Sequence, residues 1–321
     1  MKQENDNLKK IVFMGTPDFA SYILERLLDS EYTVQAVFTQ PDRPKGRSGK
    51  LQMSPVKEAA VKAGIPVYQP LKIREGDNFR ILSELAPDVI VVAAFGQIIP
   101  KQILDLPKYG CINVHASLLP AYRGAAPIQW AILNGESVTG VTTMQMGTGL
   151  DTGDMIEKTE VAIAADETGG SLFDKLKEAG ADLLLSTLSA LNNGTAVRTP
   201  QPEESPTAYA SMLTHKTGEI DWTLPAVVTE RKVRGLNPWP SAYTYLNGRQ
   251  LKIWKAAVCG GEALRGVPAG TIVRASGTDL WIQTGDGILE VLELQLEGKK
   301  RMETAAFLRG CHPEEGMLLG Q

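Results

Sequence analysis

The chain has 321 residues, of which 43% are hydrophobic and 22% charged, and its formal net charge is −4. This length suggests two domains, and this composition is ordinary for a soluble globular protein. The charge balance does not by itself indicate a nucleic-acid partner, although local basic clusters can still bind phosphate. No apolar run approaches the roughly 20 residues that span a bilayer, so we expect no membrane partner.

The cysteines and the first residues bear on the cellular compartment. Cys111, Cys259 and Cys311 lie far apart and are odd in number. This pattern fits reduced cytoplasmic thiols and offers no zinc spacing. Residues 1–7 are polar and contain acids, whereas a secretion signal has an apolar core and a transit peptide is rich in arginine. We therefore expect a cytoplasmic protein without a metal centre.

The first half of the chain alternates strand-like and helix-like segments. Apolar runs predict strands at residues 9–14, 34–39, 66–68, 89–94 and 111–115. Helical spacing predicts helices at residues 17–30, 55–64 and 79–85, and a further helix that starts over 127–133. Thr16 is expected to cap the first helix with Pro17 at its first position, and Ser54 to cap the second. Such alternation predicts a doubly wound, mostly parallel α/β sheet, with ligands beyond the carboxyl ends of the strands.

The second half changes character after a linker that begins near residue 193 and is rich in proline. Before this linker, strands are expected at 138–146 and 155–161 and a long helix at 170–191. After it, a helix near 226–236 precedes five strand candidates, at 242–246, 251–257, 270–273, 280–284 and 288–294, and a helix at 302–309. The turns Asn247-Gly248 and Asp286-Gly287 separate some of these strands. We therefore predict a first domain over 1–206 and a small OB-like β-barrel domain over 207–321.

Asn113 and His115 are the first candidates for chemistry. They close the short buried strand 111–115, and because strand side chains alternate, both point to the same face. An amide can hold an oxyanion, and an imidazole can carry a proton near neutral pH. A lone histidine is more often structural, but the strand-end position and the Pro- and Gly-containing loop that follows favour a functional role.

Asp151 is the third candidate. It lies in a loop with three glycines, which allow a backbone to approach a ligand closely. A carboxylate aimed at an imidazole would raise its pKa and fix its tautomer. The alternative is an ordinary hairpin with solvated acids, and the residues alone leave the two interpretations about even.

Basic clusters provide candidate phosphate contacts. The loop at 40–50 carries Arg43, Lys45, Arg47 and Lys50 beside a single acid, and Pro and Gly keep it irregular. Further clusters lie at 299–301, with Lys299, Lys300 and Arg301, and at 231–234. Such residues could supply sequence-independent affinity for a phosphate backbone, whereas the commoner alternative for one charge run is a solvated loop.

Familiar nucleotide motifs are missing from the sequence. The segment 15–18 after the first strand is not Gly-x-Gly-x-x-Gly, so a dinucleotide site is not favoured. The chain also has no Gly-x-x-x-x-Gly-Lys-Ser/Thr phosphate loop. No group of His, Cys, Asp and Glu has metal spacing in the sequence.

Two longer motifs resemble a known family. The segments 113–124 (NVHASLLPAYRG) and 149–154 (GLDTGD) are similar to the signature of the 10-formyltetrahydrofolate-dependent formyltransferases. The opening 12–19, the basic loop and the second domain with Leu236-Asn237-Pro238-Trp239-Pro240 most resemble the members that formylate methionyl initiator tRNA. The resemblance covers nearly the whole chain.

The resemblance implies a function in translation initiation and a role for each motif. The donor would be 10-formyltetrahydrofolate as co-substrate, the acceptor the α-amine of methionyl initiator tRNA, and no metal is needed. Asn113, His115 and Asp151 match the catalytic positions. The tetrahydrofolate-binding positions match Ser117, Leu118, Leu119 and Pro120. The loop at 40–50 matches the segment that enters the acceptor stem, the second domain matches the part that holds tRNA, and a monomer is expected.

Two other functions remain open at this stage. A formyltransferase acting on a small amine, such as glycinamide ribonucleotide or an amino-sugar nucleotide, would share the three catalytic positions but would not need a tRNA-holding domain. A noncatalytic RNA-binding protein would need the basic clusters but not Asn113, His115 and Asp151 together. Formyl transfer to charged initiator tRNA separates these alternatives.

Overall fold

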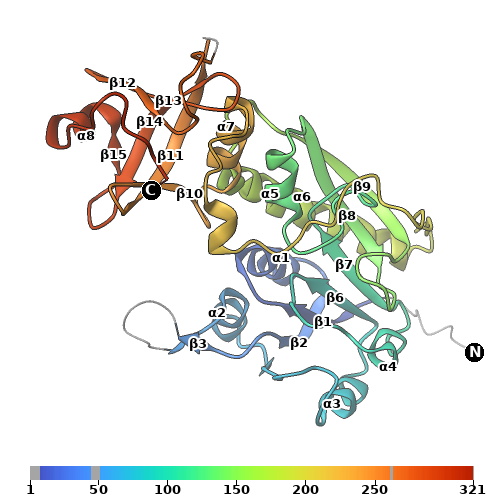
Figure 1. The fold of residues 1–321 in the computed structure, drawn as a ribbon. Helices are drawn as coiled ribbons and strands as arrows, with labels where there is room; N and C mark the ends of the chain where they lie inside the picture. Colours follow the sequence, from blue (N-terminus) through green and yellow to red (C-terminus); the bar gives the residue numbers. More distant parts are fainter. Residues whose placement is uncertain (1–7, 45–50, 261–262, 321) are drawn as a thin grey trace, which may run out of the picture. The chain divides into compact units, whose positions relative to one another are not determined.

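The computed structural model describes residues 8–44, 51–260 and 263–320. The chain divides into two compact units, which are described separately (Figure 1). The first unit contains Met1–Pro127, Val138–Ala162 and Phe173–Ala210, and the second contains Ile128–Ser137, Ile163–Leu172 and Ser211–Gln321. Among the described residues, no helix is long and apolar enough to cross a membrane.

A seven-stranded sheet organises the first unit, in the order β5-β2-β1-β6-β7-β8-β9. The strands from β5 to β7 are parallel, whereas β8 runs antiparallel to both β7 and β9. Their bounds are β1 Lys10–Gly15, β2 Thr33–Phe38, β5 Val67–Tyr68, β6 Val89–Ala93, β7 Cys111–His115, β8 Val138–Gln145 and β9 Met155–Ala162. Strands β6 and β7 are buried on both faces, as their continuous apolar runs predict.

Helices cover both faces of this sheet. On one face, Val12, Met14 and Val92 share a core with Leu82 of α3 (Asn78–Leu85) and Ile103 of α4 (Lys101–Leu104). Helix α1 (Asp18–Leu28) packs against β1, β2 and β6, and α2 (Pro55–Lys62) against β2 and β5. Helix α6 (Gly169–Asn192) contributes its residues from Phe173 onward to this unit, whereas α5 (Pro127–Leu133) belongs to the second unit from Ile128 onward. This arrangement is doubly wound and confirms the predicted fold class.

The start of α1 differs from the prediction. Pro17, rather than Thr16, occupies the N-cap position, and no side chain caps the helix. The Thr16 hydroxyl instead donates to the carbonyl oxygen of Phe95 at 3.2 Å, so it ties the end of β1 to the loop after β6. Ser54 does cap α2 as predicted, because its hydroxyl accepts a hydrogen bond from the Lys57 backbone N–H.

The base of the basic loop is more regular than predicted. Strands β3 (Arg43–Pro44) and β4 (Leu51–Gln52) pair antiparallel, with Arg43 opposite Gln52. Lys45, Arg47 and Lys50 lie outside the described residues.

The second unit is built around an antiparallel sheet in the order β10-β11-β14-β13-β12, with β15 paired to β14. The bounds are β10 Ala242–Leu246, β11 Arg249–Cys259, β12 Ile272–Ser276, β13 Asp279–Gln283, β14 Ile288–Leu296 and β15 Met302–Glu303. Asn247 and Gly248 both have positive φ, 51° and 72°, as a tight two-residue hairpin turn requires. This unit contains all five strands predicted after the linker.

A separate hydrophobic core stabilises the second unit. Trp222, Leu251, Leu294 and Phe307 are among its buried members. The unit also contains η1 (His215–Gly218), α7 (Ala226–Gly235) and α8 (Thr304–Gly310). An antiparallel β domain therefore follows the α/β domain, as predicted, while the boundary between residues 206 and 207 stays a prediction.

Candidate functional site

Strand β7 places Asn113 and His115 at the carboxyl end of the parallel strands. In the antiparallel ladder to β8, Asn113 lies opposite Met144, and His115 lies opposite Thr142. Asn113 is 8% exposed and His115 is 6% exposed. Within the described residues, the Asn113 side-chain amide has no hydrogen-bond partner. Since a buried amide normally has one, this group is suited to a ligand oxygen.

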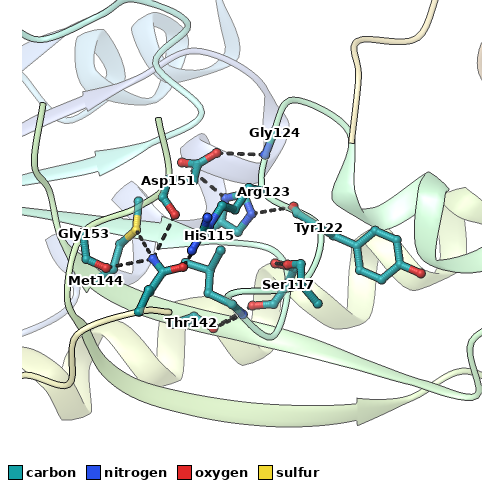
Figure 2. A network of polar contacts seen from close by, with 12 residues as sticks. His115, Ser117, Tyr122, Arg123, Gly124, Thr142, Met144, Asp151 and Gly153 are labelled. Atoms are coloured by element: carbon teal, nitrogen blue, oxygen red, sulfur yellow. Dashed lines mark hydrogen bonds and ion pairs between the residues drawn. The ribbon is translucent and has the colours of Figure 1, made fainter. Parts of the chain in front are cut away.

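The His115 ring has a different partner at each nitrogen. Its Nε2 lies 3.0 Å from the carbonyl oxygen of Tyr122, and its Nδ1 lies 3.8 Å from Oδ1 of Asp151 (Figure 2). A carbonyl oxygen can only accept a hydrogen bond, so Nε2 carries a proton. In the neutral ring, Nδ1 is therefore the nitrogen that can accept a proton, and it faces a carboxylate. The Tyr122 carbonyl thus favours the neutral tautomer with its proton on Nε2, and the role of the carboxylate in fixing the tautomer stays a prediction.

Asp151 reaches this site from the loop between β8 and β9. Its φ of +52° is in the left-handed region, which is uncommon for a residue other than glycine. Its Oδ2 accepts a hydrogen bond from the Gly124 backbone N–H at 2.9 Å (Figure 2). A Cβ on Gly124 would lie 2.5 Å from the carbonyl oxygen of Ala210, so only glycine fits there. The two carboxylate oxygens thus face one N–H donor and one imidazole.

The loop after β7 is held in place by hydrogen bonds to Thr142. The Thr142 hydroxyl donates to the carbonyl oxygen of Ser117 at 2.7 Å and accepts from the Leu119 backbone N–H at 3.0 Å. Lys158 donates to the carbonyl oxygen of Leu119, and burial lowers the pKa of Lys158. The Leu119–Pro120 peptide bond is cis. The hydrogen bonds with Thr142 and Lys158 give the segment from Ser117 to Leu119 a defined backbone path beside His115.

Several contributors to this site were not identified from the sequence. The Tyr122 carbonyl and the Gly124 N–H belong to the 113–124 motif, but backbone groups leave no mark in residue types. Thr142 is on β8 and Gln201 is in the predicted linker, and both reach the site only through tertiary folding. The pairing of β7 with β8 could have indicated Thr142 if the register had been known.

The predicted basic loop is anchored at its base. Lys57 donates to Asp42 at 2.6 Å and to Gln69 at 2.8 Å, and Gln69 donates to the other Asp42 oxygen at 2.8 Å. Hydrogen bonds from Lys57 and from Gln69 lower the pKa of Asp42. Gln40 donates to the carbonyl oxygens of Phe95 and Gly96. Arg43 follows this anchor directly and is exposed.

The basic residues of the second unit differ in how free their charges are to bind a phosphate. Lys299 and Lys300 are exposed. Arg301 forms two hydrogen bonds to Glu293 and lies 4.8 Å from the Trp254 ring centroid. Its charge is therefore partly neutralised within the protein. On α7, Lys232 donates to the carbonyl oxygen of Glu219, so this third cluster also serves internal contacts.

Comparison with protein families identifies the class. The formyl transferase model matches residues 9–188, and the model of the formyl transferase C-terminal domain matches residues 212–312. The chain belongs to the formyl transferase family, which confirms the resemblance drawn from its motifs. Among the described residues, no group of three or more His, Cys, Asp or Glu side chains could hold a metal ion.

Curated relatives narrow the comparison further. The methionyl-tRNA formyltransferase of Agathobacter rectalis is 55% identical over 307 residues, covering 96% of this chain and 98% of that protein. The methionyl-tRNA formyltransferase of Clostridioides difficile is 50% identical over 311 residues, covering 97% of this chain and 100% of that protein. Both alignments span the two units.

Solved structures share the fold at lower identity. WlaRD, a sugar 3N-formyl transferase, aligns with a TM-score of 0.65 and 18% identity over 91% of this chain and 99% of that chain. An N-formyltransferase from Helicobacter canadensis aligns with a TM-score of 0.66 and 20% identity over 88% of this chain and 98% of that chain. These similarities concern the fold alone.

Proposed function

We propose that this protein transfers a formyl group from 10-formyltetrahydrofolate to the α-amine of methionine esterified to initiator tRNA. The observation that carries this function is the meeting of Asn113, His115 and Asp151 at the end of β7, in a chain aligned over its length with methionyl-tRNA formyltransferases. The product would be the formylated initiator tRNA used in translation initiation.

The residues at the end of β7 fit a carbonyl group of the donor. The Asn113 amide is buried and has no partner among the described residues, so it can donate to an oxygen that becomes negative during transfer. The loop from Ser117 to Pro120 is assigned to folate binding because it matches the tetrahydrofolate-binding segment of the family, and its position beside His115 supports this assignment. 10-Formyltetrahydrofolate supplies the electrophilic formyl carbon. The chain supplies the oxygen contact and the proton transfers.

His115 and Asp151 have different roles in proton transfer. Because Nε2 of His115 is committed to Tyr122, protons enter and leave at Nδ1. A proton at Nδ1 makes the ring cationic, and Asp151 at 3.8 Å stabilises that charge. The Nδ1–Oδ1 distance is longer than a hydrogen bond, and such contacts commonly shorten when substrate binds. As the amine nitrogen bonds to the formyl carbon, His115 takes at Nδ1 the proton that the amine loses. It releases this proton to the folate nitrogen as the bond from that nitrogen to the formyl carbon breaks and tetrahydrofolate leaves, with Asp151 as its anionic partner.

Acceptor binding is assigned to basic residues outside this centre. Arg43, Lys45, Arg47 and Lys50 belong to the loop anchored by Asp42, while Lys299, Lys300 and Arg301 belong to the second unit. Lysine and arginine side chains bind phosphates without reading sequence, which suits contacts to an RNA backbone. Lys299 and Lys300 are the stronger candidates in the second unit, because Arg301 already pairs with Glu293.

Acceptor choice is the direct test of this function. Purified protein would be incubated with 10-formyltetrahydrofolate and, separately, methionyl initiator tRNA, glycinamide ribonucleotide or an amino-sugar nucleotide. We expect rapid formylation of the charged tRNA and background rates with the small amines. Formylation of a small amine alone would replace the proposed acceptor. Tight tRNA binding without formyl transfer would favour a noncatalytic RNA-binding protein.

A further inference from the structure

A glutamine from the predicted linker contacts the loop that carries Asp151. Gln201 Nε2 donates hydrogen bonds to the backbone carbonyl oxygens of Asp151 and Gly153, each at 2.8 Å. Its Oε1 accepts a hydrogen bond from Arg123 Nε at 3.0 Å. Since Arg123 Nε can only donate, the Gln201 amide can have only one orientation, with its NH₂ group toward the two carbonyl oxygens.

Arg123 links this glutamine to the rest of the site. Its guanidinium also donates to the carbonyl oxygens of Pro202 at 2.8 Å and Glu203 at 3.0 Å, so it fixes the backbone on which Gln201 lies. Arg123 stands between Tyr122, whose carbonyl contacts His115, and Gly124, whose N–H contacts Asp151 (Figure 2). The same short segment therefore contacts the imidazole, the carboxylate and the glutamine.

The backbone of Asp151 has a conformation that needs support. A φ of +52° costs free energy for a residue with a side chain, so surrounding contacts must hold it. Gln201 supplies a hydrogen bond to the carbonyl oxygen of Asp151 itself. A second hydrogen bond, from the Gly124 N–H, holds the side chain of Asp151. Together they fix both ends of the residue.

We propose that Gln201 is a positioning residue, which holds the backbone of Asp151 so that its carboxylate faces His115. Arg123 sets the direction of the Gln201 amide. This role rests on the proposed function, because it acts through a carboxylate assigned to formyl transfer. Gln201 itself does not need to touch either substrate.

Two substitutions test this role. Gln201→Glu keeps an acceptor for Arg123 but replaces the NH₂ donor by an oxygen that faces two carbonyl oxygens. Gln201→Met keeps the length and removes both polar groups. We expect kcat to fall on the order of 10²-fold, because small displacements of a catalytic group have effects of this size, with KM for both substrates unchanged. Glu204→Gln, at an exposed position of the same segment, is the matched control and should keep wild-type kcat.

A double-mutant cycle separates positioning from general stability. In an Asp151→Asn background the carboxylate is gone, so Gln201→Glu should lower the residual kcat very little further. An undiminished effect in that background, or wild-type kcat in both single variants, would overturn the proposal. Thermal unfolding of each variant identifies loss of folded protein, and a kcat loss fully accounted for by unfolding would also overturn it.

The activity of the wild-type protein separates failure of the proposed function from failure of the positioning role of Gln201. If it formylates methionyl initiator tRNA while the Gln201 variants match it, the positioning role is wrong and the proposed function stands. If wild type transfers no formyl group, the proposed function fails and the positioning role fails with it.

Discussion

At the scale of single residues, the two His115 nitrogens have different constraints. Tyr122 fixes the proton on Nε2, while Nδ1 faces a carboxylate that is itself held by Gly124. Asn113, on the same strand, contributes an amide without an internal partner among the described residues. In the proposed function, the Asn113 amide is the donor to an oxygen and His115 is a separate group for protons, and each can be removed by a single substitution.

Removal of the Asn113 amide should act on the chemical step. We expect Asn113→Ala to lower kcat on the order of 10²–10³-fold, as for loss of one oxyanion donor, while tRNA affinity stays nearly unchanged. Single-turnover formylation and a tRNA binding titration measure the two quantities. The buried environment makes a thermal-unfolding control necessary. Normal turnover by this variant would contradict the oxyanion role.

At position 15, close packing of the neighbouring atoms, and not a chemical role, requires glycine. A Cβ at this position would lie 2.6 Å from the Ala20 Cβ and 2.8 Å from the carbonyl oxygen of Ala93. We expect Gly15→Ala to destabilise the first unit by about 1–3 kcal/mol, the usual cost of overpacking. Denaturant unfolding measures this change. Gly147→Ala is the control, since a Cβ there would meet nothing within 4 Å, and equal stability of the two variants would contradict the prediction.

At the scale of elements, the β3–β4 hairpin depends on a polar anchor beside α2 and β5. Lys57 on α2 and Gln69 after β5 hold both oxygens of Asp42, and the basic residues follow Asp42 in the chain. The lowered pKa of Asp42 means that this anchor stabilises the fold above the unfolded-state pKa. The contribution is lost as pH falls below about 4, the ordinary range of an aspartate.

Removal of the anchor should weaken use of the acceptor more than the chemistry. We expect Lys57→Met to raise KM for tRNA about tenfold, equivalent to ~1.4 kcal/mol, with kcat at saturating tRNA retained. The physical reason is that Asp42, which directly precedes β3, loses its hydrogen bond and ion pair with Lys57. Steady-state formylation at neutral pH measures both constants. Lys62→Met, at the exposed end of α2, is the control, and equal KM values in the two variants would contradict this role.

At the scale of the whole molecule, the net charge is −4, which does not favour binding to RNA phosphates. Any affinity for RNA must therefore come from local clusters of basic residues. We expect glutamine at Arg43, Lys45 and Arg47, or at Lys299 and Lys300, to weaken tRNA binding and flatten its salt dependence. Each phosphate contact contributes about 0.7–0.9 to the slope of log affinity against log salt. Binding titrations across salt concentrations measure this slope. An unchanged slope would mean that the substituted cluster is merely solvated.

The sequence determined the parts of the protein that follow from local pattern. Strand β7 has the predicted bounds, helix α5 begins at Pro127 as predicted, and five of the six described strands of the second unit follow from short apolar runs and turns. Local sequence pattern did not predict the structure where a side chain had a competing hydrogen-bond partner or where an element was very short. Thr16 bonds to Phe95 instead of capping α1, and the four-residue helix α4 and two-residue strand β15 are too short to leave a periodic signal.

Only the tertiary structure decided which groups meet at the site. Asn113 and His115 share a strand, so their common face follows from the period of two. Two groups contact His115 from elsewhere in the chain, namely the Asp151 carboxylate and the Tyr122 carbonyl. Asp151 is in turn held by Gly124 and Gln201. No local rule fixes these contacts, because the partners are separated in the sequence. Residue types specify what a group can donate or accept. Chain folding specifies its partner, because hydrogen bonds and close packing depend on distances set by the whole unit.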